Sequence, residues 1–168
     1  MPNTHVTLMR DGRTRPIHFD WGLHFVKEPT RLASEYWHSR CQGRVMPARA
    51  DLNPGAMRKF TRHVGLVEIR RDQARHLEYF IRRAGGEWEA VFGPMTGRFI
   101  HELLPPQIEM RWREVFDSVR EKKAPVRVTT GIEFQAKAWL TMEMFVAPLG
   151  DGEESDMLYI AFIAWARS

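Results

Sequence analysis

Seven histidines and one cysteine are the side chains in this sequence that would most readily form a zinc site or supply a nucleophilic thiol. No two histidines stand four residues apart and no HExxH motif is present, so a zinc site of the usual kind is not predicted. A single cysteine excludes an internal disulfide and a zinc site built from cysteines. The residues predict no catalytic group and no metal centre, and so no enzyme. These side chains are His5, His18, His24, His38, His63, His76, His101 and Cys41.

The charge of the chain is unevenly distributed along the sequence. Residues 31–83 contain 12 basic and 5 acidic residues, whereas residues 84–168 contain 9 basic and 13 acidic ones. A field of this kind can steer an acidic protein, a nucleic acid or an anionic ligand, or it can belong to an ordinary solvated surface. No run of five Lys or Arg residues occurs, which disfavours nucleic-acid binding.

The compartment is predicted from what the sequence lacks. One cysteine favours a reducing environment. The first 22 residues contain no apolar core of a signal peptide, and no stretch of about 18 apolar residues could cross a membrane. We therefore expect a cytoplasmic protein without membrane contact.

Hydrophobic periodicity predicts the elements that must position any site. Residues 1–30 read as an N-terminal arm with possible strand pairing near 17–19, and residues 31–41 as a helix with Ala33, Trp37 and Cys41 on one side. The segment 47–54 is extended because Pro47 and Pro54 fix φ, and Arg49 and Asp51 are expected to clamp it.

The remaining patterns predict one more long helix and five strands. An apolar stripe at Ile108, Trp112, Val115, Phe116 and Val119 predicts a half-buried helix after Pro105 and Pro106. Alternation predicts strands at 64–69, 77–82, 126–134, 139–146 and 157–165, with an irregular helical region at 87–104.

Two sequence blocks resemble a known family. Residues 37–54 read WHSRCQGRVMPARADLNP and residues 93–106 read GPMTGRFIHELLPP. They are similar to the PAS-like regulatory domains common in alphaproteobacteria, and the resemblance extends over roughly residues 31–167. The residues that carry it are Trp37, Arg40, Gly43, Arg44, Pro47, Arg49, Asp51, Pro54, Gly93, Thr96, Gly97, Arg98, Glu102, Leu103 and Pro105.

The resemblance implies an α+β fold of the PAS type. It has a five-stranded antiparallel sheet, connecting helices on one face between the second and third strands, and an N-terminal helical extension. The domain is expected to cover residues 31–168, with residues 1–30 as the arm outside it. Only three residues follow the last predicted strand, so we expect a stand-alone module without an output domain.

A PAS-type interior would form where the inner face of the sheet meets the helices. Arg82 belongs to an Arg-rich strand in the family and would either fix an anionic ligand or lie on the surface. His101 could offer an axial imidazole to a haem. Cys41 could react with a flavin, but the usual motif is absent. The expected pocket residues are Phe80, Arg82, Phe92, Met95, Ile100, Trp112, Phe116, Val128, Met142, Met144 and Phe162.

The last predicted strand is apolar on both faces, so its second face must also be covered. The cover is either the chain's own helix at residues 31–41 or a second copy in a homodimer. The expected interface residues are Trp37, Trp139, Phe145, Tyr159, Ile163 and Trp165.

These observations predict a cytoplasmic signalling module that senses a small ligand or binds a signalling partner and acts through protein–protein contacts. The alternatives are a haem or flavin sensor and a protein-interaction module that holds no ligand. Nucleic-acid binding is a weaker alternative. The identity of the cofactor, ligand and partner does not follow from the sequence.

Overall fold

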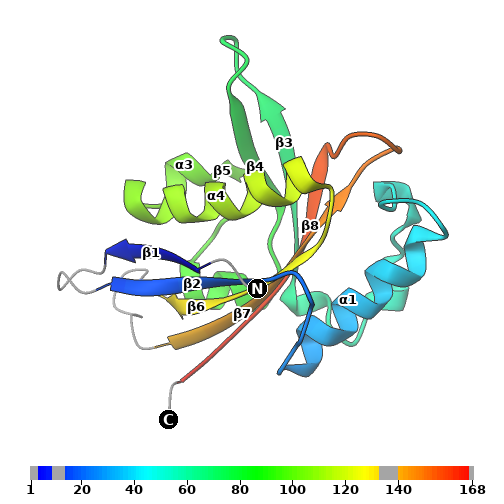
Figure 1. The fold of residues 1–168 in the computed structure, drawn as a ribbon, viewed down its shortest axis with the longest axis horizontal. Coiled ribbons are helices and arrows are strands. Elements are labelled where there is room, and N and C mark those ends of the chain that lie inside the picture. Colours follow the sequence, from blue (N-terminus) through cyan, green and yellow to red (C-terminus); the bar gives the residue numbers. More distant parts are fainter. Residues whose placement is uncertain (1–3, 9–13, 133–139, 167–168) are drawn as a thin grey trace.

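The computed structural model describes residues 4–8, 14–132 and 140–166, and within them eight strands form one sheet whose neighbours are all antiparallel. The strand order is β1-β2-β6-β7-β8-β3-β4-β5 (Figure 1). The strands are β1 (Thr4–Leu8), β2 (Thr14–Asp20), β3 (Val64–Arg71), β4 (Leu77–Arg83), β5 (Arg98–Phe99), β6 (Val126–Ile132), β7 (Leu140–Leu149) and β8 (Met157–Ala166). The helices are α1 (Glu28–Cys41), α2 (Gly86–Phe92), α3 (Ile100–Leu103) and α4 (Pro106–Lys122), with short 3-10 helices η1 (Arg49–Asp51), η2 (Pro54–Met57) and η3 (Thr61–His63).

The α+β class and the antiparallel sheet predicted from the sequence are confirmed. The five strands β4-β3-β8-β7-β6 lie side by side, and α2, α3 and α4 connect the second to the third of them along the chain. The predicted total of five strands is wrong, because β1, β2 and the two-residue β5 extend the sheet at its edges.

The N-terminal segment supplies two of the added strands. β2 pairs with β6, placing Phe19 opposite Val128, and β1 pairs with β2. The side chains of Ile17 and Phe19 are buried in the main core. Residues 14–20 therefore pack as part of the sheet, in agreement with the strand pairing expected near residues 17–19.

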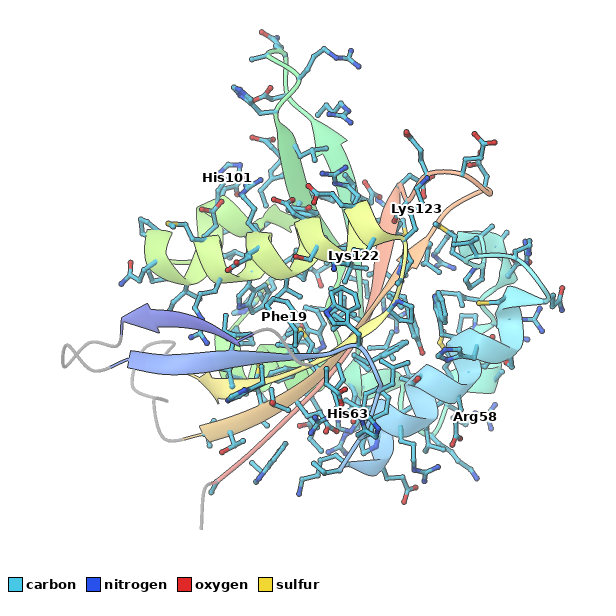
Figure 2. All side chains as sticks on the ribbon, in the orientation of Figure 1. Phe19, Arg58, His63, His101, Lys122 and Lys123 are labelled. Carbon is cyan, nitrogen blue, oxygen red and sulfur yellow. The ribbon has the colours of Figure 1, made fainter. Side chains whose placement is uncertain are left out.

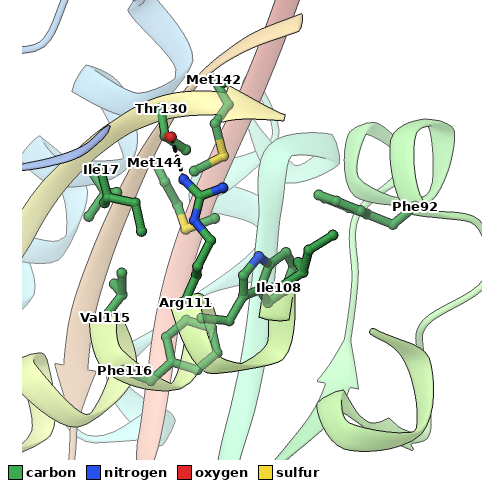
Figure 3. A pocket seen from close by; sticks show the side chains of 12 residues that line it. Ile17, Phe92, Ile108, Arg111, Val115, Phe116, Thr130, Met142 and Met144 are labelled. Carbon is green, nitrogen blue, oxygen red and sulfur yellow. Dashed lines mark hydrogen bonds between the residues drawn. The ribbon is translucent and has the colours of Figure 1, made fainter. Parts of the chain in front are cut away.

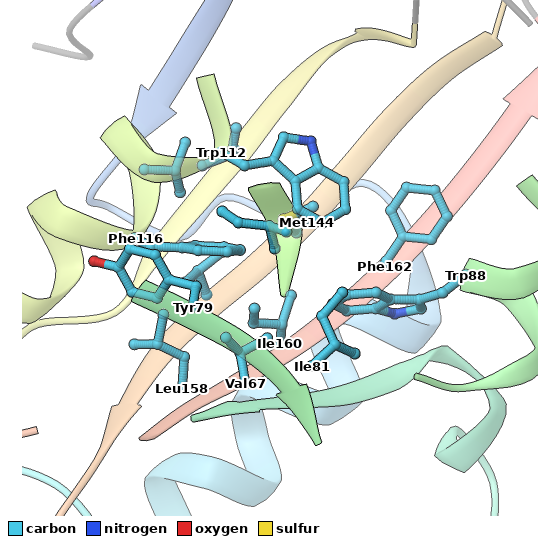
Figure 4. Packing of buried hydrophobic residues seen from close by; sticks show 14 of the residues in the cluster. Val67, Tyr79, Ile81, Trp88, Trp112, Phe116, Met144, Leu158, Ile160 and Phe162 are labelled. Carbon is cyan, nitrogen blue, oxygen red and sulfur yellow. The ribbon is translucent and has the colours of Figure 1, made fainter. Parts of the chain in front are cut away.

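The larger core lies between the sheet and the helices α2 and α4. Trp88 of α2 packs edge-on against Trp112 of α4 and Phe162 of β8, with ring centroids 6.1 and 6.0 Å apart (Figure 4). The Tyr79 hydroxyl donates to the carboxylate of Asp117 on α4. Burial and this carboxylate raise the pKa of Tyr79, so the hydroxyl keeps the proton that it donates.

The second core lies on the opposite face of the sheet, under α1 (Figure 1). Trp37 packs edge-on against Phe145, and its Nε1 donates to the carbonyl of Pro148 at 3.0 Å. The Tyr159 hydroxyl donates to the carbonyl of Ala33 at 3.2 Å. Burial raises the pKa of Tyr159 and so preserves this donor. The chain's own helix therefore covers the second apolar face of β7 and β8.

Gly85, just before α2, allows the chain to approach the loop at η3. A Cβ at this position would lie 2.3 Å from the carbonyl oxygen of Arg62, whereas a Cβ at Gly86 would meet nothing within 4 Å. We expect Gly85→Ala to lower the free energy of unfolding by about 1–3 kcal/mol or more, because backbone atoms must move apart. Gly86→Ala, inside the helix, should be neutral or stabilise by up to about 1 kcal/mol.

Urea unfolding of the two glycine variants tests this close approach, and each serves as the other's control. Equal effects at the two positions would show that the contact at Gly85 relaxes without cost.

Candidate functional site

An apolar cavity lies in the larger core, between α4 and the sheet (Figure 3). It is small, since the centres of water molecules could occupy about 40 Å³ of it. One water requires about 10–15 Å³ on this measure, so the cavity has room for a few waters or a small organic molecule. Its lining residues are Ile17, Phe92, Ile108, Arg111, Trp112, Val115, Phe116, Val128, Thr130, Gly131, Met142 and Met144.

The periodicities of the surrounding elements bring these side chains together. On α4, positions three and four residues apart share one face, which joins Arg111 to the apolar stripe. On β6 and β7, alternate residues face the helix, namely Val128 and Thr130, and Met142 and Met144. Two methionines give this wall an adaptable surface, because their unbranched side chains change rotamer at little cost.

Arg111 is the charged group of the cavity lining. Its side chain extends from α4 towards β6 and β7, and its Nη2 donates to the hydroxyl of Thr130 (Figure 3). The residue is only 8% exposed. A guanidinium carries five N–H donors, so Arg111 and Thr130 form a polar corner in an otherwise apolar cavity.

The structure places six of the eleven expected pocket residues in the cavity lining, namely Phe92, Trp112, Phe116, Val128, Met142 and Met144. Met95, Ile100 and Phe162 are buried in the same core without lining the cavity. The lining residues not anticipated are Ile17, Ile108, Arg111, Val115, Thr130 and Gly131. Arg111 follows Ile108 by three residues and so lies on the same helical face as Trp112 and Val115. This spacing was the signal that could have identified Arg111 as a lining residue.

Phe80 and Arg82 do not reach the cavity, contrary to the sequence expectation. On β4 the inward residues are Tyr79 and Ile81, so their neighbours face the other side of the sheet. Phe80 lies under the guanidinium of Arg70, 3.7 Å from it. The Arg82 side chain is 65% exposed, with its Nε 3.7 Å from the carboxylate of Glu68.

The cavity does not fit a haem or a flavin. Among the described residues of its lining there is no histidine, cysteine or tyrosine to ligate haem iron, and its volume suits a few waters rather than a large ring system. His101 lies on α3 at the surface, stacked on Phe99 and 3.5 Å from the carboxylate of Glu78 (Figure 2). Cys41 ends α1 on the opposite side of the sheet, and burial raises the pKa of its thiol, which disfavours the reactive thiolate.

The residues expected at an interface lie in different environments in the structure. Trp37 of α1 and Phe145 and Tyr159 of the sheet are buried between α1 and the strands, so they are not available to a second subunit while α1 stays docked. Ile163 and Trp165 are half-buried near the end of β8, with the Lys27 ammonium 4.3 Å from the Trp165 ring. Trp139 lies outside the described residues.

A buried carboxylate on β7 holds the start of α1. Glu143 is fully buried and accepts hydrogen bonds from the amides of Val26 and Lys27 at 3.0 and 3.1 Å. The hydroxyl of Thr30 donates to the same carboxylate. Arg127 of β6 compensates its charge, with Nε at 2.7 Å. The side chain of Lys27, the N-cap residue of α1, makes no capping hydrogen bond. The carboxylate of Glu143, on the adjacent strand β7, therefore caps the N-terminus of α1 instead.

The alternation of β7 places this carboxylate between the two cavity methionines. Met142 and Met144 face the cavity, and Glu143 faces α1 on the other side of the same strand. On β6, Val128 lines the cavity while the preceding Arg127 pairs with Glu143. A change in the position of either strand at the cavity therefore moves the groups that hold α1.

The part of the chain that the structure describes contains neither a candidate metal site nor a candidate membrane-spanning helix. No three His, Cys, Asp or Glu side chains gather there in a way that could hold a metal ion. No helix among those residues is both long enough and apolar enough to cross a membrane.

Comparison with known protein families matches residues 26–162 to the PAS domain. Comparison with characterised proteins and with solved structures finds no match. The matched region runs from just before α1 to β8 and contains the cavity helices, the five central strands and Glu143. The chain belongs to the PAS domain family.

Proposed function

We propose that this PAS domain senses a small ligand in the cavity beside α4 and transmits its presence through β6 and β7 to α1. Membership of the family makes the protein a signalling or sensory module in general terms. The observation that carries the specific proposal is the order Met142, Glu143, Met144, in which two cavity residues flank the carboxylate that caps α1.

The cavity lining indicates the chemistry of the ligand. Most of the wall is aliphatic, aromatic or thioether, which favours a compact apolar body. Arg111 adds a cationic donor at one corner, which favours a carboxylate or another acceptor oxygen on that body. The small volume favours a short carboxylic acid over a long chain, because a larger molecule would require the core to open.

The output in this proposal is a change in how α1 is held. Glu143 and Arg127 are the polar contacts that join the cavity strands to the start of α1. A ligand that shifts β7 would loosen or tighten these bonds and so alter the surfaces that α1 presents to another protein. PAS domains often mediate protein interactions, which agrees with an output of this kind.

NMR of protein labelled with ¹³C at the methionine methyl groups tests the proposal. Butyrate serves as the probe and butanol as the matched neutral probe. We expect butyrate to shift the Met142 and Met144 methyl signals in a saturable manner. Met46 and Met57, in the second core under α1, report whether the change also reaches that side of the sheet.

Variants of the cavity lining make this experiment specific. Arg111→Met should weaken butyrate binding about tenfold or more, since a charge-assisted hydrogen bond contributes about 1.5–3 kcal/mol. Binding of butanol should be nearly unchanged. Val115→Phe should fill the cavity and abolish both responses.

The same samples test transmission to α1 by amide exchange. Butyrate should change the exchange rates of the first turn of α1 in the parent protein. If neither probe shifts Met142 or Met144, the interior is closed to ligands of this class and the chain is better explained as a protein-interaction module. Native mass spectrometry of freshly purified protein reports in parallel any bound molecule and the number of subunits.

A further inference from the structure

A second hollow lies on the α1 side of the sheet, between the 3-10 helices and the start of β3. Its floor is formed by Leu52, Met57, Val64 and Leu66, which keep 5%, 7%, 7% and 6% exposure. Pro54 and Thr61 complete the wall, and Arg49 and Arg83 stand at its rim. The groove is sized for about one side chain, since water centres could occupy about 30 Å³ of it.

The two rim arginines have no ion-pair partner among the residues that the structure describes. The clamp between Arg49 and Asp51 expected from the sequence does not form. Asp51 is instead held by Arg44, whose Nη2 lies 2.9 Å from its carboxylate, and by the amide of Ala48. These two contacts lower the pKa of Asp51 below its usual value, with the Ala48 amide contributing most. Arg49 is left exposed and directed to the groove.

The surroundings of the groove are also basic. Arg58 and Lys59 directly follow the floor residue Met57 and are exposed (Figure 2 labels Arg58). The nearby acid Glu87 is neutralised by Arg62, at 2.5 Å. None of the described residues that line the groove is acidic. A partner that fits must therefore supply negative charge around a small apolar group.

We propose that this groove binds an acidic segment of a partner protein. An aliphatic side chain of the segment lies on Leu52, Met57 and Leu66, and flanking Asp or Glu residues pair with Arg49 and Arg83. The floor offers no aromatic ring on which a base could stack, and the rim offers two separate cations rather than a continuous basic track. These features favour a peptide over a nucleic acid.

The inference rests on the proposed function in one respect, because it names the chemistry of the partner that reads the module. The groove borders the region under α1, and its floor residues belong to the same core as Trp37 and Tyr159. A displacement of α1 would thus reach the floor of the groove.

Fluorescence anisotropy with a labelled nine-residue peptide tests the groove. The probe carries a central Leu flanked on each side by four Asp or Glu residues. We expect Arg49→Glu and Arg83→Glu each to weaken its binding at least about tenfold, because like charges then face each other. Arg75→Glu, in the exposed turn between β3 and β4, makes the same change in net charge and should leave binding within about twofold.

Matched probes decide between the possible outcomes. A peptide with Ser in place of the central Leu should bind more weakly, and one with Lys in place of the acids should not bind. If all three charge variants lose the same amount of peptide affinity, the effect is one of net charge, and the proposed binding in the groove is wrong. A twenty-residue oligo-dT that binds better than the peptide, with loss in the same two variants, would replace the proposal by nucleic-acid binding. Failure of the acidic peptide to bind would also end it.

The methionine methyl signals measured on the same samples separate this inference from the proposed function. Arg49→Glu and Arg83→Glu should leave the butyrate response of Met142 and Met144 unchanged. A lost peptide interaction with an intact methyl response would remove the groove and leave the ligand cavity standing. Peptide binding without any methyl response would support the groove and remove the ligand cavity.

Discussion

Glu143→Ala is expected to lower the free energy of unfolding by about 3–5 kcal/mol, because it deprives the largely buried Arg127 of its closer carboxylate partner and removes the cap of α1. Arg127 has a side chain only 15% exposed and pairs with Glu143 on one side and Asp20 on the other. The amides of Val26 and Lys27 also lose their acceptor. Few surface carboxylates could produce an effect of this size.

Urea unfolding measures the loss at Glu143, and hydrogen exchange locates it. Protection should fall first in α1, while the amides of β6 and β8 are less affected. Glu153→Ala, in the exposed loop between β7 and β8, is the matched control and should change stability by less than about 0.5 kcal/mol. Glu143→Gln retains one acceptor oxygen and should cost less than Ala. If Glu143→Ala costs no more than Glu153→Ala, the carboxylate does not hold α1.

Trp88→Ala is expected to cost about 3–5 kcal/mol through loss of packing and creation of a cavity. The indole is fully buried, and its Nε1 donates to the carbonyl of His63 at 2.8 Å. Its edge lies directly over Gly65 of β3, where a Cβ would be 2.7 Å from the ring. Trp88→Phe should recover part of the packing but not the hydrogen bond.

A double-mutant cycle between Gly65 and Trp88 makes the second prediction specific. Gly65→Ala alone should destabilise the protein by about 1–3 kcal/mol, because the new methyl group meets the ring. In the Trp88→Ala background the clash is gone, so the same substitution should cost much less. Additive effects measured by thermal or urea unfolding would contradict the contact.

Much of the fold follows from periodicity that a single sequence displays. The stripe from Ile108 to Val119 predicted α4, which the structure gives as Pro106–Lys122. The strict alternation after Val126 and the run after Met157 predicted β6 and β8. The antiparallel sheet and the place of the helices between the second and third strands came from the family resemblance, since hydrogen-bond partners across a sheet leave no local trace.

The parts that could not be predicted depend on long-range contacts. β4 carries apolar residues on both faces, Tyr79 and Ile81 on one and Phe80 on the other, so alternation alone cannot say which face is the core. β2 holds Pro16 and lies between glycines, and pairing with β6 stabilises it as a strand against these local signals. The role of Glu143 depends on contacts to residues more than a hundred positions away along the chain.

The directions of two sets of charged side chains, on α4 and in η1, could not be predicted either. Arg111 has the spacing of a core residue but the charge of a surface one, and its hydrogen bond to the Thr130 hydroxyl opposite helps to accommodate it. Arg49 and Asp51 are two residues apart, yet the 3-10 turn η1 rotates them apart, and Arg44 takes the carboxylate. Sequence spacing therefore located the segments better than it located the directions of their charged side chains.

The central hairpin of β7 and β8 is covered on both faces by cores that share no residue. Leu140 to Leu149 pair with Met157 to Ala166 over ten positions, so the hairpin retains its ladder when one covering layer leaves. Partial opening on the α1 side then exposes one face without releasing the other, as in the sub-global unfolding units of many proteins. Opening of the α1 layer should accordingly cost less free energy than complete unfolding.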